Sequence, residues 1–208
     1  IVFGDWSSDV CSSDLSSYEW YDNPSVVIAR CEQYHEATVK RTEAFLALDP
    51  QPDLILIGIS GFMITNPEPI FRQLALPTLQ AVTKLCKEAG VISQIHCCGP
   101  ERQLVKLAAE ESDLDNINPL EPPPMGDCDL ADLKRRWGNR ISLMGNLHTT
   151  EVMLLGSVEK VIEESKRAID DAGAGGGFIL STGDQCGRDT PDENLRAMIT
   201  TARDYGRY

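Results

Sequence analysis

The sequence predicts an α/β fold in which parallel strands and helices alternate to form a (β/α) barrel. Five short apolar segments each precede an amphipathic segment, and no linker interrupts the series. The run Asp53–Ser60 is nearly continuously apolar, as in a strand covered on both faces. No Gly-x-Gly-x-x-Gly motif follows a strand, which disfavours an open dinucleotide-binding sheet. Since a complete barrel has eight units, we expect a (β/α)8 barrel truncated to about five C-terminal βα units.

The N-terminal residues do not read as part of this fold. Asp5–Leu15 spell DWSSDVCSSDL, which is the translation of a common sequencing-library adapter in one reading frame. We therefore expect residues 1–15 to be an artefact without a fold. The barrel portion would then comprise residues 16–208, entering the gene in mid-sequence, and Cys11 would have no function.

The expected strands are marked by β-branched and apolar runs. They lie at Asp53–Ser60, Val91–Cys97, Asp115–Leu120, Ile141–Gly145 and Gly177–Ser181.

The helices are marked by their ends. Asn23–Pro24 begins one that continues to about Leu48, because proline is favoured at the first helical position. Asn66–Pro67 begins a second, which Pro77 should break into two pieces before Gly90. The next three helices are expected at 100–111, 129–137 and 157–171. The segment Thr190-Pro-Asp-Glu193 predicts a capping box at the start of the terminal helix.

Composition restricts the class of function. The chain has 208 residues and a formal net charge of −13, which argues against a nucleic-acid or anionic-membrane partner. No apolar run approaches the roughly 20 residues that span a bilayer. Seven cysteines without a regular framework indicate a reducing compartment, so we expect a cytoplasmic protein.

The segment His96-Cys97-Cys98-Gly99 is the most informative strand end, because barrel enzymes place their reactive groups at the C-terminal ends of strands. Side chains alternate along a strand, so His96 and Cys98 should share one face and Cys97 the other. An imidazole and a thiol on one face could bind the same zinc ion. A buried histidine beside two small thiols explains the segment equally well.

A third metal ligand could come from the last strand-end loop, Ser181-Thr-Gly-Asp-Gln-Cys186. We take Cys186 as the candidate, since three protein ligands with an open fourth position are typical of catalytic zinc. Asp184 competes for this place, and is also a candidate acid or base. Both residues could equally be ordinary loop residues.

Three further strand-end residues could meet a substrate. His148 is a candidate catalytic residue, and Asn146 in the same strand-end segment is a candidate substrate contact. Glu121, which precedes three prolines, is another candidate substrate contact. Satisfied loop side chains would explain all three without a substrate.

These segments resemble the uroporphyrinogen decarboxylase superfamily. The resemblance lies, in the family order, in Ile95–Gly99, Asn116–Glu121, Leu133–Gly138, Gly176–Ser181 and, most specifically, Asp189–Met198 followed by Ala202–Gly206. It implies a barrel of the uroporphyrinogen decarboxylase type, in agreement with the strand count.

The resemblance implies one of two activities. Family methyltransferases use zinc, held by a His-x-Cys pair and a later Cys, to activate a thiol that takes a methyl group from a corrinoid; a corrinoid protein is then a partner. Decarboxylases of the family remove carboxyl groups from a tetrapyrrole without a cofactor. We favour the methyltransferase, with the decarboxylase as the alternative and a non-catalytic corrinoid- or partner-binding member as a third possibility.

The sequence departs from both family patterns at the third ligand. Six residues before Thr190, decarboxylases usually carry His and methyltransferases usually carry Cys, whereas this chain has Asp184, with Cys186 two residues later. Either Cys186 reaches in through a shifted loop or Asp184 replaces the thiolate with an oxygen ligand. A second departure is Gly58-Ile-Ser-Gly61, where decarboxylases tend to carry an aspartate.

Overall fold

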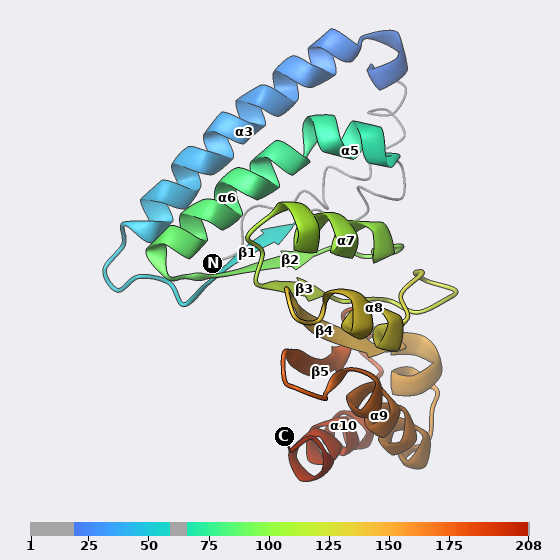
Figure 1. Cartoon of the computed structure of the whole chain (residues 1–208). Helices are drawn as coiled ribbons and strands as arrows, with labels where there is room; N and C mark the ends of the chain where they lie inside the picture. Colours follow the sequence, from blue (N-terminus) through green and yellow to red (C-terminus); the bar gives the residue numbers. More distant parts are fainter. Residues whose placement is uncertain (1–18, 59–65, 208) are drawn as a thin grey trace. The chain divides into compact units, whose positions relative to one another are not determined.

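The computed structural model describes residues 19–58 and 66–207 and shows an α/β fold with one five-stranded parallel sheet (Figure 1). The expected artefact at residues 1–15 and most of the Gly58–Gly61 segment lie outside the described residues. The strands follow the chain order, β1-β2-β3-β4-β5. This order is that of successive βα units wound in one direction, as the sequence predicted.

The five strands lie within one or two residues of their predicted bounds. They are β1 (Leu54–Gly58), β2 (Ile92–His96), β3 (Asn116–Asn118), β4 (Ser142–Leu147) and β5 (Phe178–Thr182).

The helices also follow the predicted series. They are α3 (Pro24–Leu46), α5 (Glu68–Leu74), α6 (Leu76–Ala89), α7 (Arg102–Glu111), α8 (Leu130–Trp137), α9 (Val158–Ala172) and α10 (Asp192–Tyr205). A π-helix, η1 (Thr149–Leu154), was not predicted. None of the helices within the described ranges is long and apolar enough to cross a membrane.

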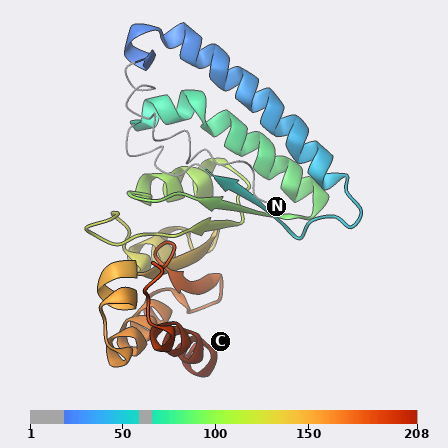
Figure 2. The same cartoon turned by 180° about the vertical axis from the view of Figure 1, so that it is seen from behind.

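The chain forms two compact units. The first contains the residues up to Cys97 together with Lys106–Asn116. Within it, α3 runs alongside α6 (Figures 1 and 2), and α6 packs on β2. Helix α6 buries a stripe at helical spacing, Leu79, Val82, Thr83 and Cys86.

The β1 and β2 strands have one fully buried face. Ile55 and Ile95 are completely buried, whereas Leu54 and Leu56 on the alternate positions of β1 are half-buried. Ile92 is 50% exposed. The sequence predicted cover on both faces of β1, but the described residues of β1 bury only one face fully.

The second unit contains Cys98–Val105 and Ile117–Tyr208. Helices α9 and α10 lie side by side, and α9 also packs on β4 and β5 (Figure 2). Ser157 caps α9 by accepting a hydrogen bond from the backbone N–H of Lys160. Asp129 caps α8 in the same way through the N–H of Asp132.

The predicted capping box at the start of α10 is wrong. Helix α10 has no side-chain cap bond, and its N-cap residue is Pro191. The Thr190 hydroxyl is buried without a hydrogen-bond partner in the described part of the chain. Helix α10 is instead tied at Asn194, whose amide donates to the carbonyl oxygens of Met153 and Gly156 at 3.0 and 2.9 Å. The start of α10 is therefore held by a tertiary contact, and not by the local capping box that the sequence pattern predicted.

Candidate metal centre

The end of β2 presents alternating side chains. His96 is the last residue of the strand and is half-buried. Cys97 is completely buried, and Cys98, the next residue, is half-buried. This is the alternation that the strand period predicts, with His96 and Cys98 apart from the buried Cys97.

Asp184 comes from the loop that follows β5, and local hydrogen bonds fix its conformation. The Thr182 hydroxyl donates to the backbone carbonyl of Asp184 at 2.6 Å. Oδ1 of Asp184 accepts from the backbone N–H of Gln185 at 2.7 Å. Oδ2 therefore remains directed at Cys98, whose thiol donates to it with an Sγ–Oδ2 distance of 3.4 Å.

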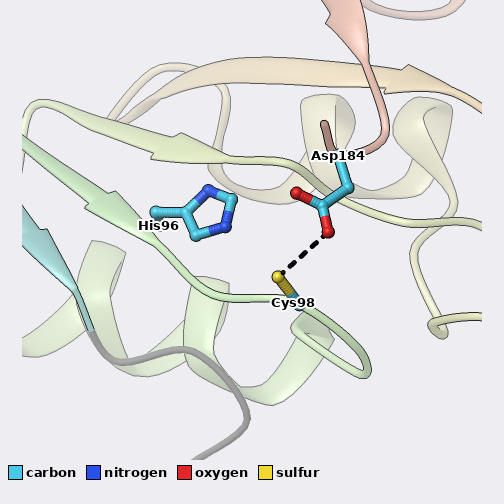
Figure 3. A group of neighbouring side chains, drawn as sticks. All are labelled: His96, Cys98 and Asp184. Atoms are coloured by element: carbon cyan, nitrogen blue, oxygen red, sulfur yellow. Dashed lines mark hydrogen bonds between the residues drawn. The ribbon is translucent and has the colours of Figure 1, made fainter. Parts of the chain in front are cut away.

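His96, Cys98 and Asp184 together form a potential metal-binding group (Figure 3). One ligand atom from each residue lies within 4.8 Å of the other two. Ligand atoms that share a tetrahedral zinc ion lie roughly 3.4–3.6 Å apart, given bond lengths of about 2.0–2.3 Å. The Cys98–Asp184 separation already meets this value, and imidazole, thiolate and carboxylate are all zinc ligands. The three residue types therefore fit a zinc ion, and the Cys98–Asp184 pair already lies at a ligand-to-ligand separation.

Two of the three predicted metal ligands, His96 and Cys98, belong to the group that could hold an ion. Cys186 is half-buried in the same loop but does not belong to the group of described residues that could share an ion. Asp184, the competing candidate for the third ligand, is the third member of the group. Gln185 lies between Asp184 and Cys186, and its backbone N–H donates to Oδ1 of Asp184. This turn directs Asp184 toward Cys98 and leaves Cys186 outside the group.

Glu121 is buried and bonded to the backbone beside Cys98. Its Oε2 accepts from the backbone N–H of Gly99 at 2.6 Å. Only 6% of the residue is exposed. The structure thus uses this candidate substrate contact to hold the segment after β2, and contact with a substrate stays a prediction.

Asn146 and His148 are also engaged with the backbone. The Asn146 amide is buried and donates to the carbonyl oxygen of Leu120 at 2.9 Å. Nδ1 of His148 accepts from the N–H groups of Thr150 and Glu151 at 3.2 and 3.1 Å, which caps η1. Because Nδ1 is the acceptor, a ring proton lies on Nε2, which is buried without a partner in the described part of the chain.

Sequence reasoning missed Glu101. This residue is completely buried, and its Oε2 accepts from the backbone N–H of Leu120. Burial raises the pKa of Glu101 well above its ordinary value, and the nearby charges of Glu121, Asp127 and Asp184 act in the same direction. A single glutamate after a Gly-Pro turn gives no sequence sign of burial, since glutamate is almost always exposed.

Comparison with known proteins supports the resemblance to the uroporphyrinogen decarboxylase family along the chain. The profile of the family "Uroporphyrinogen decarboxylase (URO-D)" matches residues 21–205. The methylcobamide:CoM methyltransferase MtaA of Methanosarcina barkeri is 25% identical over 201 residues, which cover 93% of this chain and 55% of that protein. The uroporphyrinogen decarboxylase of Pseudoalteromonas translucida is 29% identical over 76 residues, or 36% of this chain and 21% of that enzyme.

A solved structure shares the fold. A methyltransferase from Methanosarcina mazei superimposes with a TM-score of 0.74 at 20% identity, covering 94% of this chain and 54% of that protein. The chain thus spans about half the length of the methyltransferases it matches. Its fold is the truncated (β/α) barrel that the strand series predicted.

The methyltransferase match extends along nearly the whole chain, whereas the decarboxylase match is confined to about a third of it. The match to the family itself spans residues 21–205 of this chain. This chain is a member of the uroporphyrinogen decarboxylase (URO-D) family.

Proposed function

We propose that this chain is the metal-binding portion of a zinc-dependent methyltransferase, which transfers a methyl group from a methylated corrinoid to a thiol-type acceptor. The observation that supports the proposal is the set of His96, Cys98 and Asp184 at the strand ends of a barrel. The MtaA relative, whose name specifies a methylcobamide donor and CoM as acceptor, supports the same reaction class.

The three side chains suit a catalytic zinc site. A neutral imidazole, one thiolate and one carboxylate together balance the charge of Zn²⁺, as an imidazole and two thiolates would. Three protein ligands leave a fourth position for an acceptor. When bound, zinc lowers the pKa of a coordinated thiol, so that the acceptor is a thiolate at neutral pH. Asp184 supplies a harder oxygen donor than a second thiolate would.

The chain's own residues keep these side chains in place. Asp184 has one carboxylate oxygen fixed by Gln185 and the other directed at Cys98. Oδ2 of Asp184 accepts a hydrogen bond from the Cys98 thiol. The two side chains are thus held at a ligand-to-ligand separation by the loop itself, which reduces the ordering cost of metal binding.

His148 fits the role of a hydrogen-bond donor better than that of a base. Its Nδ1 lone pair already accepts two backbone N–H bonds at the start of η1. The other ring nitrogen, Nε2, then carries a proton and acts as a donor, not as an acceptor. We therefore assign His148 to donating a hydrogen bond to a substrate oxygen, and Asn146 and Glu121 to supporting the neighbouring strand-end segments.

The proposal has two alternatives. A decarboxylase acting on a tetrapyrrole is favoured by the partial matches to uroporphyrinogen decarboxylases. A non-catalytic member would bind a corrinoid protein without turnover. Under each reading a partner is a small molecule. The methyltransferase and the non-catalytic member would also bind a corrinoid or a corrinoid protein. The net charge of −13 argues against nucleic acid as a partner.

Metal content and turnover separate these functions. The purified protein should contain one zinc per chain, lost in Cys98→Ala and retained in Cys186→Ser. It should demethylate methylcobalamin in the presence of coenzyme M. A metal-free protein that decarboxylates uroporphyrinogen would contradict the proposal and favour the decarboxylase. Stoichiometric binding of methylcobalamin without demethylation would favour the non-catalytic reading.

A further inference from the structure

Two buried glutamates connect the segments that follow β2 and β3, because each accepts a hydrogen bond from a backbone N–H of the other segment. Glu121, after β3, accepts from the N–H of Gly99, after β2. Glu101, after β2, accepts from the N–H of Leu120, after β3. Glu101 therefore holds the residue that precedes Glu121, and Glu121 holds the residue that follows Cys98. We call these two bonds the glutamate clamp.

The clamp holds a residue in an unfavourable backbone conformation. Leu120 has φ of 59°, in the left-handed region that a branched side chain rarely adopts. Such a conformation is strained and persists only where surrounding contacts enforce it. At Leu120 the N–H is bound by Glu101 and the carbonyl oxygen by Asn146. Its side chain is completely buried, which fixes the residue from a third direction.

The clamp is also tightly packed around its backbone. A Cβ atom on Gly126 would lie 2.3 Å from the carbonyl oxygen of Glu121 and 2.6 Å from that of Gly99. The segment at Gly126 thus contacts both halves of the clamp. The two strand-end segments cannot move apart or together without disturbing this contact.

We propose that Glu101 is a positioning residue for Cys98. It fixes Leu120, Leu120 directs the neighbouring Glu121, and Glu121 holds Gly99 beside the Cys98 thiol. Loss of Glu101 therefore alters the position of a metal ligand that Glu101 does not touch. The proposal deepens the proposed function, because Cys98 matters as a ligand of the zinc site.

The burial of Glu101 specifies what the clamp requires. One oxygen accepts from Leu120, while Oε1 is buried without a partner in the described part of the chain. Burial raises the pKa of this carboxyl, which favours its neutral form. A neutral acceptor of the same length should therefore replace it. Glutamine meets this requirement, whereas leucine has similar bulk without an acceptor.

The first test needs no metal. Hydrogen exchange of the metal-free protein should be faster at the Gly99 and Leu120 amides in Glu101→Leu than in the parent, by at least tenfold, and near the parent value in Glu101→Gln. Faster exchange at Leu120 alone would overturn the proposal, because the effect would not reach the residue beside Cys98. If Glu101→Leu does not fold, Glu101→Asp shortens the side chain and serves in its place.

The second test uses Co²⁺, whose absorption reports the geometry of a thiolate site. Glu101→Leu should bind Co²⁺ at least tenfold more weakly than the parent with an altered spectrum, and Glu101→Gln should match the parent. Leu133→Ala, in the buried face of α8, is the control for general destabilisation. Equal losses of Co²⁺ affinity in Leu133→Ala and Glu101→Leu would overturn the positioning role.

These tests separate the two proposals. A parent protein that binds no Co²⁺ contradicts the proposed zinc site, while hydrogen exchange at Gly99 still decides whether Glu101 controls the segment at Cys98. A parent that binds Co²⁺ normally, with Glu101→Leu unchanged in affinity, spectrum and exchange, overturns the positioning role and leaves the zinc site standing.

Discussion

The thiol of Cys98 donates to a carboxylate oxygen of Asp184 across 3.4 Å, although the two residues are 86 positions apart in the chain. One follows β2 and the other follows β5. Their separation matches that of two atoms bound to one tetrahedral zinc ion. This pair is the basis of the proposed His96, Cys98 and Asp184 metal site, in which an oxygen ligand stands where the family resemblance leads us to expect a thiolate.

The identity of the third ligand can be changed within the same geometry. Asp184→Ala should weaken Co²⁺ binding about 10–100-fold, because one of three protein ligands is removed. Asp184→Cys should retain binding and roughly double the sulfur-to-cobalt charge-transfer absorption, because a second thiolate enters the site. Cys186→Ser is the matched control in the same loop and should leave affinity and spectrum unchanged. A loss of binding in Cys186→Ser with Asp184→Ala unaffected would reverse the ligand assignment.

Gly126 should tolerate no side chain. An alanine Cβ would lie 2.3 Å from the Glu121 carbonyl oxygen, and backbone atoms cannot rotate away as a side-chain end can. Gly126→Ala should lower the free energy of unfolding by about 1–3 kcal/mol, as measured by urea denaturation. Gly187→Ala is the control, since nothing lies within 4 Å of its Cβ position. Equal stability of the two variants would show that the segments around Gly126 are loosely held.

Asn194 should stabilise the start of α10 through its two hydrogen bonds to carbonyl oxygens. Asn194→Asp keeps the side-chain shape but replaces the donating amide with acceptor oxygens, which would face the carbonyls of Met153 and Gly156. We expect a loss of about 2–3 kcal/mol in the free energy of unfolding. The exposed Arg196→Ala in the same helix should change it by less than about 0.5 kcal/mol. A loss in Asn194→Asp no larger than the control would contradict this role.

Glu101 should make stability depend on pH in a direction opposite to that of a salt-bridged acid. Its pKa is raised in the folded protein by burial and by the charges of Glu121, Asp127 and Asp184. Below the unfolded pKa of about 4.3 the carboxyl is neutral in both states. As pH rises from there toward the folded pKa, only the unfolded state releases the proton, so stability falls by about 1.4 kcal/mol per pH unit.

Glu101→Gln isolates this effect because it cannot titrate. The unfolding free energy of Glu101→Gln minus that of the parent should increase from pH 4 upward and level off above the folded pKa of Glu101. Urea denaturation at successive pH values measures the difference. A difference that is flat between pH 4 and pH 8 would show that the folded protein does not disfavour the charged carboxyl.

Local sequence signals predicted most of the fold. Pro24 and Ser157 mark helix starts, and Gly90, with φ of 71°, ends α6 as a left-handed C-cap residue. Such features depend on neighbours within one turn, so they can be read from the sequence. The η1 helix could not, because it depends on the particular rotamer in which His148 caps two backbone N–H groups.

The candidate site was predictable only in part for the same reason. The spacing of His96 and Cys98 follows from the period of one strand. The choice between Asp184 and Cys186 depends on a turn closed by the Thr182 hydroxyl and the Asp184 carboxylate, which residue spacing does not determine. Glu101 and Leu120 escaped prediction because their burial and conformation result from tertiary packing.

X-ray absorption at the zinc edge tests the central claim most directly, because it counts the sulfur atoms around the ion. In the zinc-loaded protein without an added thiol, one sulfur, from Cys98, should lie in the first shell, with the remaining ligands nitrogen or oxygen. Asp184→Cys should raise the count to two. Two sulfurs in the parent, one of them lost in Cys186→Ser, would contradict the His96, Cys98 and Asp184 site.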